Sequence, residues 1–158
     1  MKLFEQINGN NFKLKKSLLE LNSSNNEAIN IVKQYIQNSS KGDLNLTKMK
    51  LNELPKISAD FNVSGNFICS YNELNTNLVG SPKSVGRNFD CSNNQLKSLY
   101  GASKNVNGNF ICSYNELESL EGAPNSVNGD FWCVNNHPIK FTEEQVRAVC
   151  SVKGRIHV

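Results

Sequence analysis

Four cysteines recur at nearly regular intervals, and they are the residues of this 158-residue chain best suited to metal or nucleophilic chemistry. Cys69, Cys91, Cys112 and Cys133 lie 22, 21 and 21 residues apart, and His137 follows the last of them by four residues. Zinc requires ligands that converge at about 2.0–2.3 Å. Residues at one position of successive stacked strands instead form a file about 4.8 Å apart. The spacing therefore predicts buried packing, and neither a metal nor a cofactor is expected.

The usual catalytic groupings are missing from the sequence. Cys150 and His157 lie near the C-terminal end, and no third residue is evident that would orient them as a nucleophile and its base. A Gly-Lys-Ser/Thr phosphate loop is absent, and the glycines fall where a repeating chain needs corners. We do not expect an enzyme.

The cysteines belong to a longer repeated unit between Gly65 and Asn136. The segment Gly-Asn-Phe-Ile-Cys-Ser-Tyr-Asn-Glu-Leu begins at Gly65 and again at Gly108, and variants of it begin at Arg87 and Gly129. Such self-similarity indicates stacked structural repeats. Alternation along a Phe-x-Cys strand places Phe and Cys on one face, which must be the core. The asparagines three residues after each cysteine are expected to form a ladder of amides that bond the backbone of neighbouring turns: Asn72, Asn94, Asn115 and Asn136.

Capping elements are expected at both ends of the repeats. Apolar residues at helical spacing predict an amphipathic helix over residues 26–38, with N-cap candidates at 23–26. A diverged copy of the repeat follows, in which Leu44 occupies the position of Phe67. Thr142 and Gln145 predict a capping box and a helix to about Cys150, and residues 151–158 predict a turn and a short final strand. Further upstream, residues 12–14 alternate like a strand and residues 17–21 could form a helical turn.

The repeat resembles leucine-rich repeats, because Phe67, Cys69, Asn72 and Leu74 match the second half of the pattern Leu-x-x-Leu-x-Leu-x-x-Asn-x-Leu. It departs from that pattern at the first leucine, since the valine of each turn precedes the phenylalanine by four residues and not three. It is more closely similar to short repeat proteins of tailed bacteriophages, which carry Cys-Ser-x-Asn-x-Leu turns, a Gly-Ala-Pro corner and a closing segment like residues 140–150. This resemblance covers roughly residues 43–157 and implies a fold and a viral origin, but little chemistry.

The predicted fold class is therefore an α+β repeat. It is a leucine-rich-repeat-like solenoid with a parallel sheet of about five short strands, capped by an N-terminal helix and a C-terminal helix. We expect an N-terminal helical cap over residues 1–42, the solenoid over 43–136 and a C-terminal cap over 137–158, in a single compact domain.

The residue between Phe and Cys must point away from the core, which predicts an outer row of Asn45, Ile68, Asp90, Ile111 and Trp132. Beside it runs a serine row, made of Thr47, Ser70, Ser92, Ser113 and Val134. Apolar and aromatic side chains on a rigid concave surface are typical of protein interfaces. The predicted partner-binding residues are Ile68, Asp90, Ile111, Trp132, Tyr71, Tyr114, Ser92 and Val134. Two alternatives stay open: isoleucine also simply suits strands, and the C-terminal cap could cover Trp132.

Charge disfavours nucleic acid as the partner. The chain carries a net charge of +3, but residues 65–136 contain four basic and six acidic side chains, a balance of minus two. Phosphate backbones bind basic surfaces. The remaining bases flank the repeats, as at Lys13, Lys15 and Lys16.

Composition also bears on where the protein works. No apolar run approaches the roughly 18 residues of a membrane helix, and residues 1–5 lack the apolar centre of a signal peptide. Five cysteines do not suit a secreted disulfide framework. We expect a cytoplasmic protein that has no membrane contact.

The sequence favours a non-enzymatic binding protein of a phage, made in the cytoplasm of the infected cell. It would bind and modulate or inhibit a host protein, for example in a defence system. The alternatives are a virion or assembly component and a nucleic-acid-binding protein. Self-association through the exposed last strand or through the concave surface is also left open.

Overall fold

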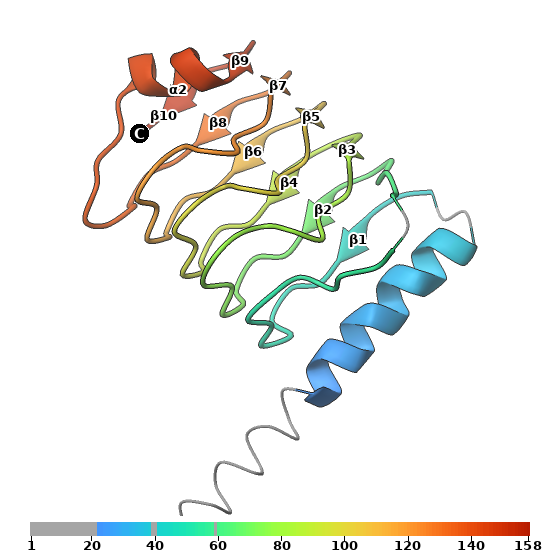
Figure 1. Ribbon diagram of the computed structural model, residues 1–158. Helices are drawn as coiled ribbons and strands as arrows, with labels where there is room; N and C mark the ends of the chain where they lie inside the picture. Colours follow the sequence, from blue (N-terminus) through green and yellow to red (C-terminus); the bar gives the residue numbers. More distant parts are fainter. Residues whose placement is uncertain (1–21, 39–40, 59) are drawn as a thin grey trace, which may run out of the picture.

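The repeats wind into a solenoid whose turns stack through two parallel sheets (Figure 1). The computed structural model describes residues 22–38, 41–58 and 60–158. The larger sheet has six strands in the order β1-β2-β4-β6-β8-β10, and the smaller has four in the order β3-β5-β7-β9. Each pairing joins equivalent positions of neighbouring turns, such as Phe67 with Phe89 and Phe89 with Phe110. The capped α+β repeat fold predicted from the sequence is confirmed.

Every strand in the described part of the chain is two residues long. The six-stranded sheet consists of β1 (Leu44–Asn45), β2 (Phe67–Ile68), β4 (Phe89–Asp90), β6 (Phe110–Ile111), β8 (Phe131–Trp132) and β10 (Ile156–His157). The four-stranded sheet consists of β3 (Ser84–Val85), β5 (Asn105–Val106), β7 (Ser126–Val127) and β9 (Ser151–Val152). The sequence predicted about five strands in one sheet. The structure adds β10 to that sheet and forms a second sheet where the chain returns at each valine.

The core is a stack of identical side chains. The ring centroids of Phe67 and Phe89 lie 5.0 Å apart at an interplanar angle of 74°, and those of Phe89 and Phe110 lie 5.2 Å apart at 77°. Aromatic rings favour such edge-to-face contacts, which add about 0.5–1.5 kcal/mol to the effect of burial. Beside this file lie the four buried cysteines, as their shared repeat position predicts.

The predicted asparagine ladder is present and connects neighbouring turns. Asn94 Nδ2 donates to the carbonyls of Cys69 (3.1 Å) and Cys91 (3.0 Å), and its Oδ1 accepts from the backbone N–H groups of Asn72 and Leu74, both at 3.2 Å. Two-residue strands leave many backbone groups without ladder partners, and these amides satisfy several of them. At the strand ends, the asparagine side chains therefore make hydrogen bonds that backbone groups would make in a longer sheet.

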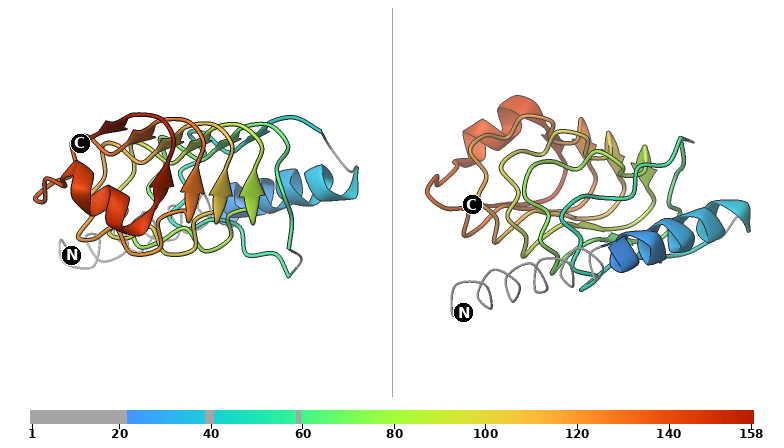
Figure 2. Two further views of the ribbon diagram at one scale, coloured as in Figure 1. Left: turned by 90° about the horizontal axis from the view of Figure 1, so that it is seen from above. Right: turned by 60° about the horizontal axis from the view of Figure 1, so that its bottom comes forward.

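A helix over residues 22–37 covers the first turn, seen in blue in Figures 1 and 2. Its residues Ala28, Val32 and Tyr35 are buried in the core. The Tyr35 hydroxyl donates to the Gly42 carbonyl at 3.0 Å. The predicted helix and its packing role are confirmed, but the N-cap prediction is wrong, because residues 23–26 are already helical. Several cap-forming residues in succession do not by themselves define where a helix begins.

The opposite end of the stack carries α2 (Glu143–Val149), as Figure 2 shows. Thr142 is the N-cap, and the capping box with Gln145 is formed in both directions: the Gln145 N–H donates to Thr142 Oγ1 and the Thr142 N–H donates to Gln145 Oε1. Phe141 and Val146 are both buried in the core. The predictions for this cap are confirmed, including the final strand, since β10 pairs with β8.

Two expectations fall on residues that the structure does not describe. The strand-like segment 12–14 and the helical turn 17–21 lie outside the described residues. Within the part of the chain that is described, no helix is long and apolar enough to cross a membrane.

Replacing one ladder asparagine should destabilise the fold more than any exposed polar substitution. Asn115→Ala removes hydrogen bonds to the Cys91 and Cys112 carbonyls and to the Leu96 N–H. Because the abandoned backbone groups stay buried, the free energy of unfolding should fall by about 2–4 kcal/mol in urea denaturation. Gln95→Ala, at a neighbouring exposed position, should change it by less than about 0.5 kcal/mol. Equal effects of the two changes would show that the ladder does not hold the turns together.

Candidate protein-binding face

The outer row predicted from the pleat lies on the outside of the six-stranded sheet. Strand pairing aligns its members directly, with Ile68 beside Asp90, Asp90 beside Ile111, and Ile111 beside Trp132. These four side chains are partly exposed, while their neighbours in the strands are buried. After the exposed Asn45, which pairs with Ile68, the row therefore presents two isoleucines, one carboxylate and one indole along one line of the stack.

His157 is a sixth member of the outer row that the sequence analysis did not predict. It pairs with Trp132 in register between β10 and β8. The last strand has Ile156 and Val158 where the repeats have Phe and Cys, so the repeat motif does not identify it. The alternation of residues 155–158 after Gly154 was the one feature of the sequence that indicated a strand here.

The serine row is less accessible than the sequence suggested. Ser70, Ser92 and Ser113 are 3%, 7% and 4% exposed. Ser92 donates through its N–H and its hydroxyl to Asp90 Oδ1, at 2.9 and 2.7 Å. The chain turns immediately after each cysteine, so the alternation of inward and outward side chains ends there. The serine side chains therefore lie buried against the chain and do not point outward. Ser92 therefore acts by positioning Asp90, whereas Val134 at the end of the row stays partly exposed.

Two tyrosines lie at the strand ends and are strongly exposed. Tyr71 is 55% and Tyr114 54% exposed, and both have a positive φ, 55° and 57°. The same turn position is occupied by Lys48, Asn93 and Asn135, also at positive φ. We call this file the tyrosine column: Lys48, Tyr71, Asn93, Tyr114 and Asn135. Asparagine tolerates the left-handed conformation, whereas a tyrosine there carries strain.

The tyrosine column is held in register by the backbone. The N–H of Tyr71 donates to the Ser92 carbonyl at 3.1 Å, and that of Tyr114 donates to the Val134 carbonyl at 3.0 Å. The Lys48 ammonium lies 5.4 Å from the centroid of the Tyr71 ring, which is within the range of a cation–π contact. The phenol rings therefore extend from rigid positions.

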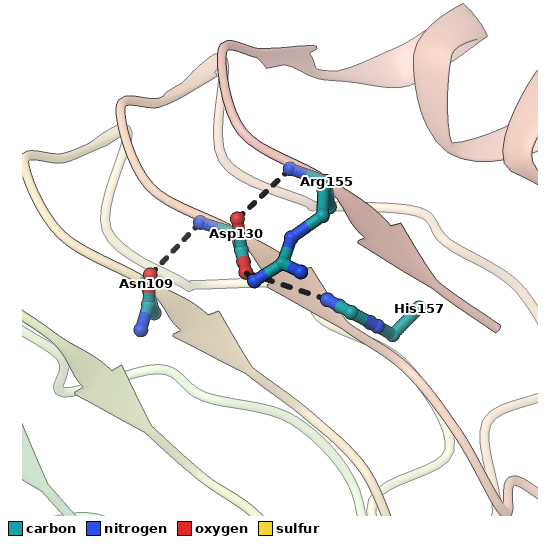
Figure 3. A network of polar contacts seen from close by, with 4 residues as sticks. All are labelled: Asn109, Asp130, Arg155 and His157. Carbon is teal, nitrogen blue, oxygen red and sulfur yellow. Dashed lines mark hydrogen bonds and ion pairs between the residues drawn. The ribbon is translucent and has the colours of Figure 1, made fainter.

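The C-terminal end of the outer row carries a polar network (Figure 3). The Arg155 N–H donates to Asp130 Oδ1 at 2.9 Å, and the guanidinium of Arg155 and the ring of His157 approach Asp130 Oδ2 at 3.2 and 3.4 Å. The Arg155 N–H first, and then His157 and the Arg155 charge, hold the pKa of Asp130 below its usual value against the effect of desolvation.

This network also answers whether the C-terminal cap covers Trp132. The His157 ring stacks on the indole, with centroids 3.6 Å apart and an interplanar angle of 9°. His157 therefore covers one face of the ring, while Trp132 as a whole stays partly exposed. The cover that this stacking provides comes from the last strand.

Asp130 belongs to a second ladder that the sequence analysis missed. The residue before each core side chain accepts, through Oδ1, the N–H of its counterpart in the next turn, with N···O distances of 2.7–3.0 Å. The accepting residues are Asp43, Asn66, Asn88, Asn109 and Asp130. The signal was visible, because every turn before the last has Asn or Asp at this position, and the last has Arg155. Together the two ladders brace both ends of each short strand in the six-stranded sheet.

The buried cysteines are poorly placed for chemistry. Burial raises the pKa of Cys69, Cys91 and Cys112 well above the usual value, and that of Cys150 to about 11. A thiol reacts and binds metal as the thiolate, which is therefore scarce at neutral pH. The Sγ atoms of Cys91 and Cys112 lie 3.4 and 3.3 Å from the carbonyls of Ile111 and Trp132. Among the described residues, no group of three or more His, Cys, Asp or Glu side chains could hold a metal ion.

No protein family model, curated protein or solved structure was found to match the chain.

Replacing the column tyrosines with asparagine should stabilise the protein. Tyr71→Asn and Tyr114→Asn install the residue that occupies this position in two other turns, as Asn93 and Asn135. Relief of left-handed strain should raise the free energy of unfolding by about 0.5–1 kcal/mol for each change, measured by urea denaturation. Tyr100→Asn serves as the control, because Tyr100 is equally exposed at 58% but has no positive φ. A loss of stability in both column variants would mean that the rings pack on the fold and are not held out for a partner.

Proposed function

We propose that this chain is a non-enzymatic protein-binding solenoid that binds its partner through the outer row and the tyrosine column. The observation that carries the proposal is the placement of exposed tyrosines at strained positions beside two partly exposed isoleucines and the one tryptophan. Strain that a simple substitution would relieve is typical of functional sites. Tyrosine and tryptophan are also the residues that most often dominate binding energy at interfaces.

The rigidity of the frame supports the same reading. The backbone groups around the outer row are bonded from turn to turn, directly and through two side-chain ladders. A face that is ordered before binding loses little conformational freedom when the partner arrives, so more of the contact energy appears as affinity. Ser92 adds to this by holding the Asp90 carboxylate in place.

The resemblance of the repeats to phage-encoded repeat proteins supports a bacterial host protein as the partner. We propose that the chain is a phage accessory protein, which acts in the host cytoplasm and modulates or inhibits that host protein. A component of a defence system is one specific form of this proposal. No reaction is assigned to the chain.

The test is affinity capture from phage-infected bacteria with tagged full-length protein. A specific host protein should be recovered, and Ile111→Glu and Trp132→Ala should each lose about 90% of it, since each change costs more than about 1.4 kcal/mol of binding at a central anchor. Asn105→Glu is the matched control, because Asn105 is an exposed strand residue of the other sheet. Circular dichroism and thermal unfolding check that each variant is folded.

Persistence of capture in both variants, or an equal loss in Asn105→Glu, would contradict the proposal. Recovery of the chain in purified virus particles would favour an assembly role. Binding to DNA or RNA that falls steeply with salt would favour nucleic acid.

A further inference from the structure

Two turns of the solenoid, separated by one other turn, carry the same outward-facing residues. The turns that begin at Phe67 and Phe110 share the sequence Phe-Ile-Cys-Ser-Tyr-Asn-Glu-Leu, whereas the turn between them places Asp90, Asn93 and Gln95 at the three outward positions. The face therefore carries two equivalent subsites, each consisting of an isoleucine, a tyrosine and a glutamate. The first subsite is Ile68, Tyr71 and Glu73, and the second is Ile111, Tyr114 and Glu116.

The separation of these subsites follows from the stacking. Two steps between neighbouring strands span about 9.6 Å. The spacing holds at the tyrosines as well as in the strands, because the backbone bonds of Tyr71, Asn93 and Tyr114 continue the ladder there. Both rings are equally exposed and have nearly equal φ angles. A partner that uses both subsites must place two similar groups on one side about 9.6 Å apart.

A polyproline II helix has this repeat. It returns to the same face every three residues, about 9.3 Å along its axis. An α-helix returns nearly to the same face after seven residues, about 10.5 Å, and an extended strand after two, about 6.7 Å. The polyproline II repeat differs least from the spacing of the subsites. Exposed aromatic rings are also the surface on which proline-rich segments dock in known recognition modules.

The charges on the face indicate what else such a segment carries. Glu73 and Glu116 are exposed beside the tyrosines, and Asp90 lies between the two isoleucines. Asp90 holds Ser92 through Oδ1 alone, and Oδ2 has no hydrogen-bond partner among the described residues. These carboxylates complement lysine or arginine. The Lys48 ammonium on the Tyr71 ring shows that a cation also fits against a column tyrosine.

We propose that the face binds a proline-rich segment in the polyproline II conformation, with prolines three residues apart on the two subsites and a basic residue between them whose long side chain reaches back to Asp90. This inference rests on the proposed function, since it names the kind of segment that the protein partner inserts. The segment runs along the stack, across the strands, so that each proline contacts one isoleucine–tyrosine pair.

The experiment measures binding of three fluorescein-labelled peptides to the full-length protein by fluorescence anisotropy. The first peptide has prolines at every third position with arginines between them, and the second has the same composition with the prolines four residues apart. The third is an α-helical peptide of equal charge with leucines seven residues apart. The first should bind at least about tenfold more tightly than either of the others, because its repeat matches the spacing of the two subsites best.

Variants then locate the binding. Tyr71→Asn and Tyr114→Asn should each weaken binding of the first peptide by about tenfold, although both should be more stable than the native protein. Tyr100→Asn, which removes an equally exposed tyrosine outside the column, should leave binding unchanged. The variants separate loss of a contact from loss of fold, because stability and binding should move in opposite directions.

Absence of binding by the first peptide, tighter binding of the helical peptide, or an equal effect of Tyr100→Asn would overturn this inference. Its failure is distinguishable from that of the proposed function. If host-protein capture still depends on Ile111 and Trp132, the face binds a partner but the segment is not of the polyproline II class. If that dependence is also absent, the face itself is wrongly assigned.

Discussion

Hydrogen bonding between equivalent positions of successive turns is the interaction on which this structure depends. Backbone bonds between successive turns extend beyond the two-residue strands, but N–H groups such as those of Leu74 and Leu96 meet no carbonyl of the neighbouring turn. Two files of side chains supply the missing bonds, one from the asparagines after each cysteine and one from Asn or Asp before each core residue. The stacked phenylalanines and the buried thiols then fill the narrow core inside the solenoid.

This arrangement separates the residues that hold the fold from those that distinguish one turn from another. The inward and ladder positions are nearly the same in every turn, because each must fit its copy above and below. The outward positions are not constrained in this way, and there the chain places Ile68, Asp90, Ile111 and Trp132. Some outward residues of the tyrosine column even lower stability. Two turns have tyrosine at the positive φ where two others have asparagine, which adopts that conformation more easily. A surface of this kind is what the proposed binding role requires.

The sequence predicts much of this fold because repetition reveals register. The 21-residue period, the inward Phe and Cys, the Asn72 ladder and the Thr142 capping box all follow from local pattern and alternation. The burial of Ser92 does not, since it depends on how sharply the chain turns after the strand. The contact between His157 and Trp132 is long-range and lies in a turn without the repeat motif. Each strand of the second sheet contains a single inward valine, and one apolar residue is too short a pattern to predict a strand.

The most direct test of the binding face uses the one tryptophan of the chain. Full-length protein labelled with 5-fluorotryptophan gives a single ¹⁹F resonance, from Trp132. Before binding, the resonance should respond to exchange of H₂O for D₂O, because the indole is partly exposed. When the captured host protein is added, it should shift and lose most of that solvent response. An unchanged resonance in a complex that size-exclusion chromatography shows to be formed would contradict the account, because the partner would then bind elsewhere.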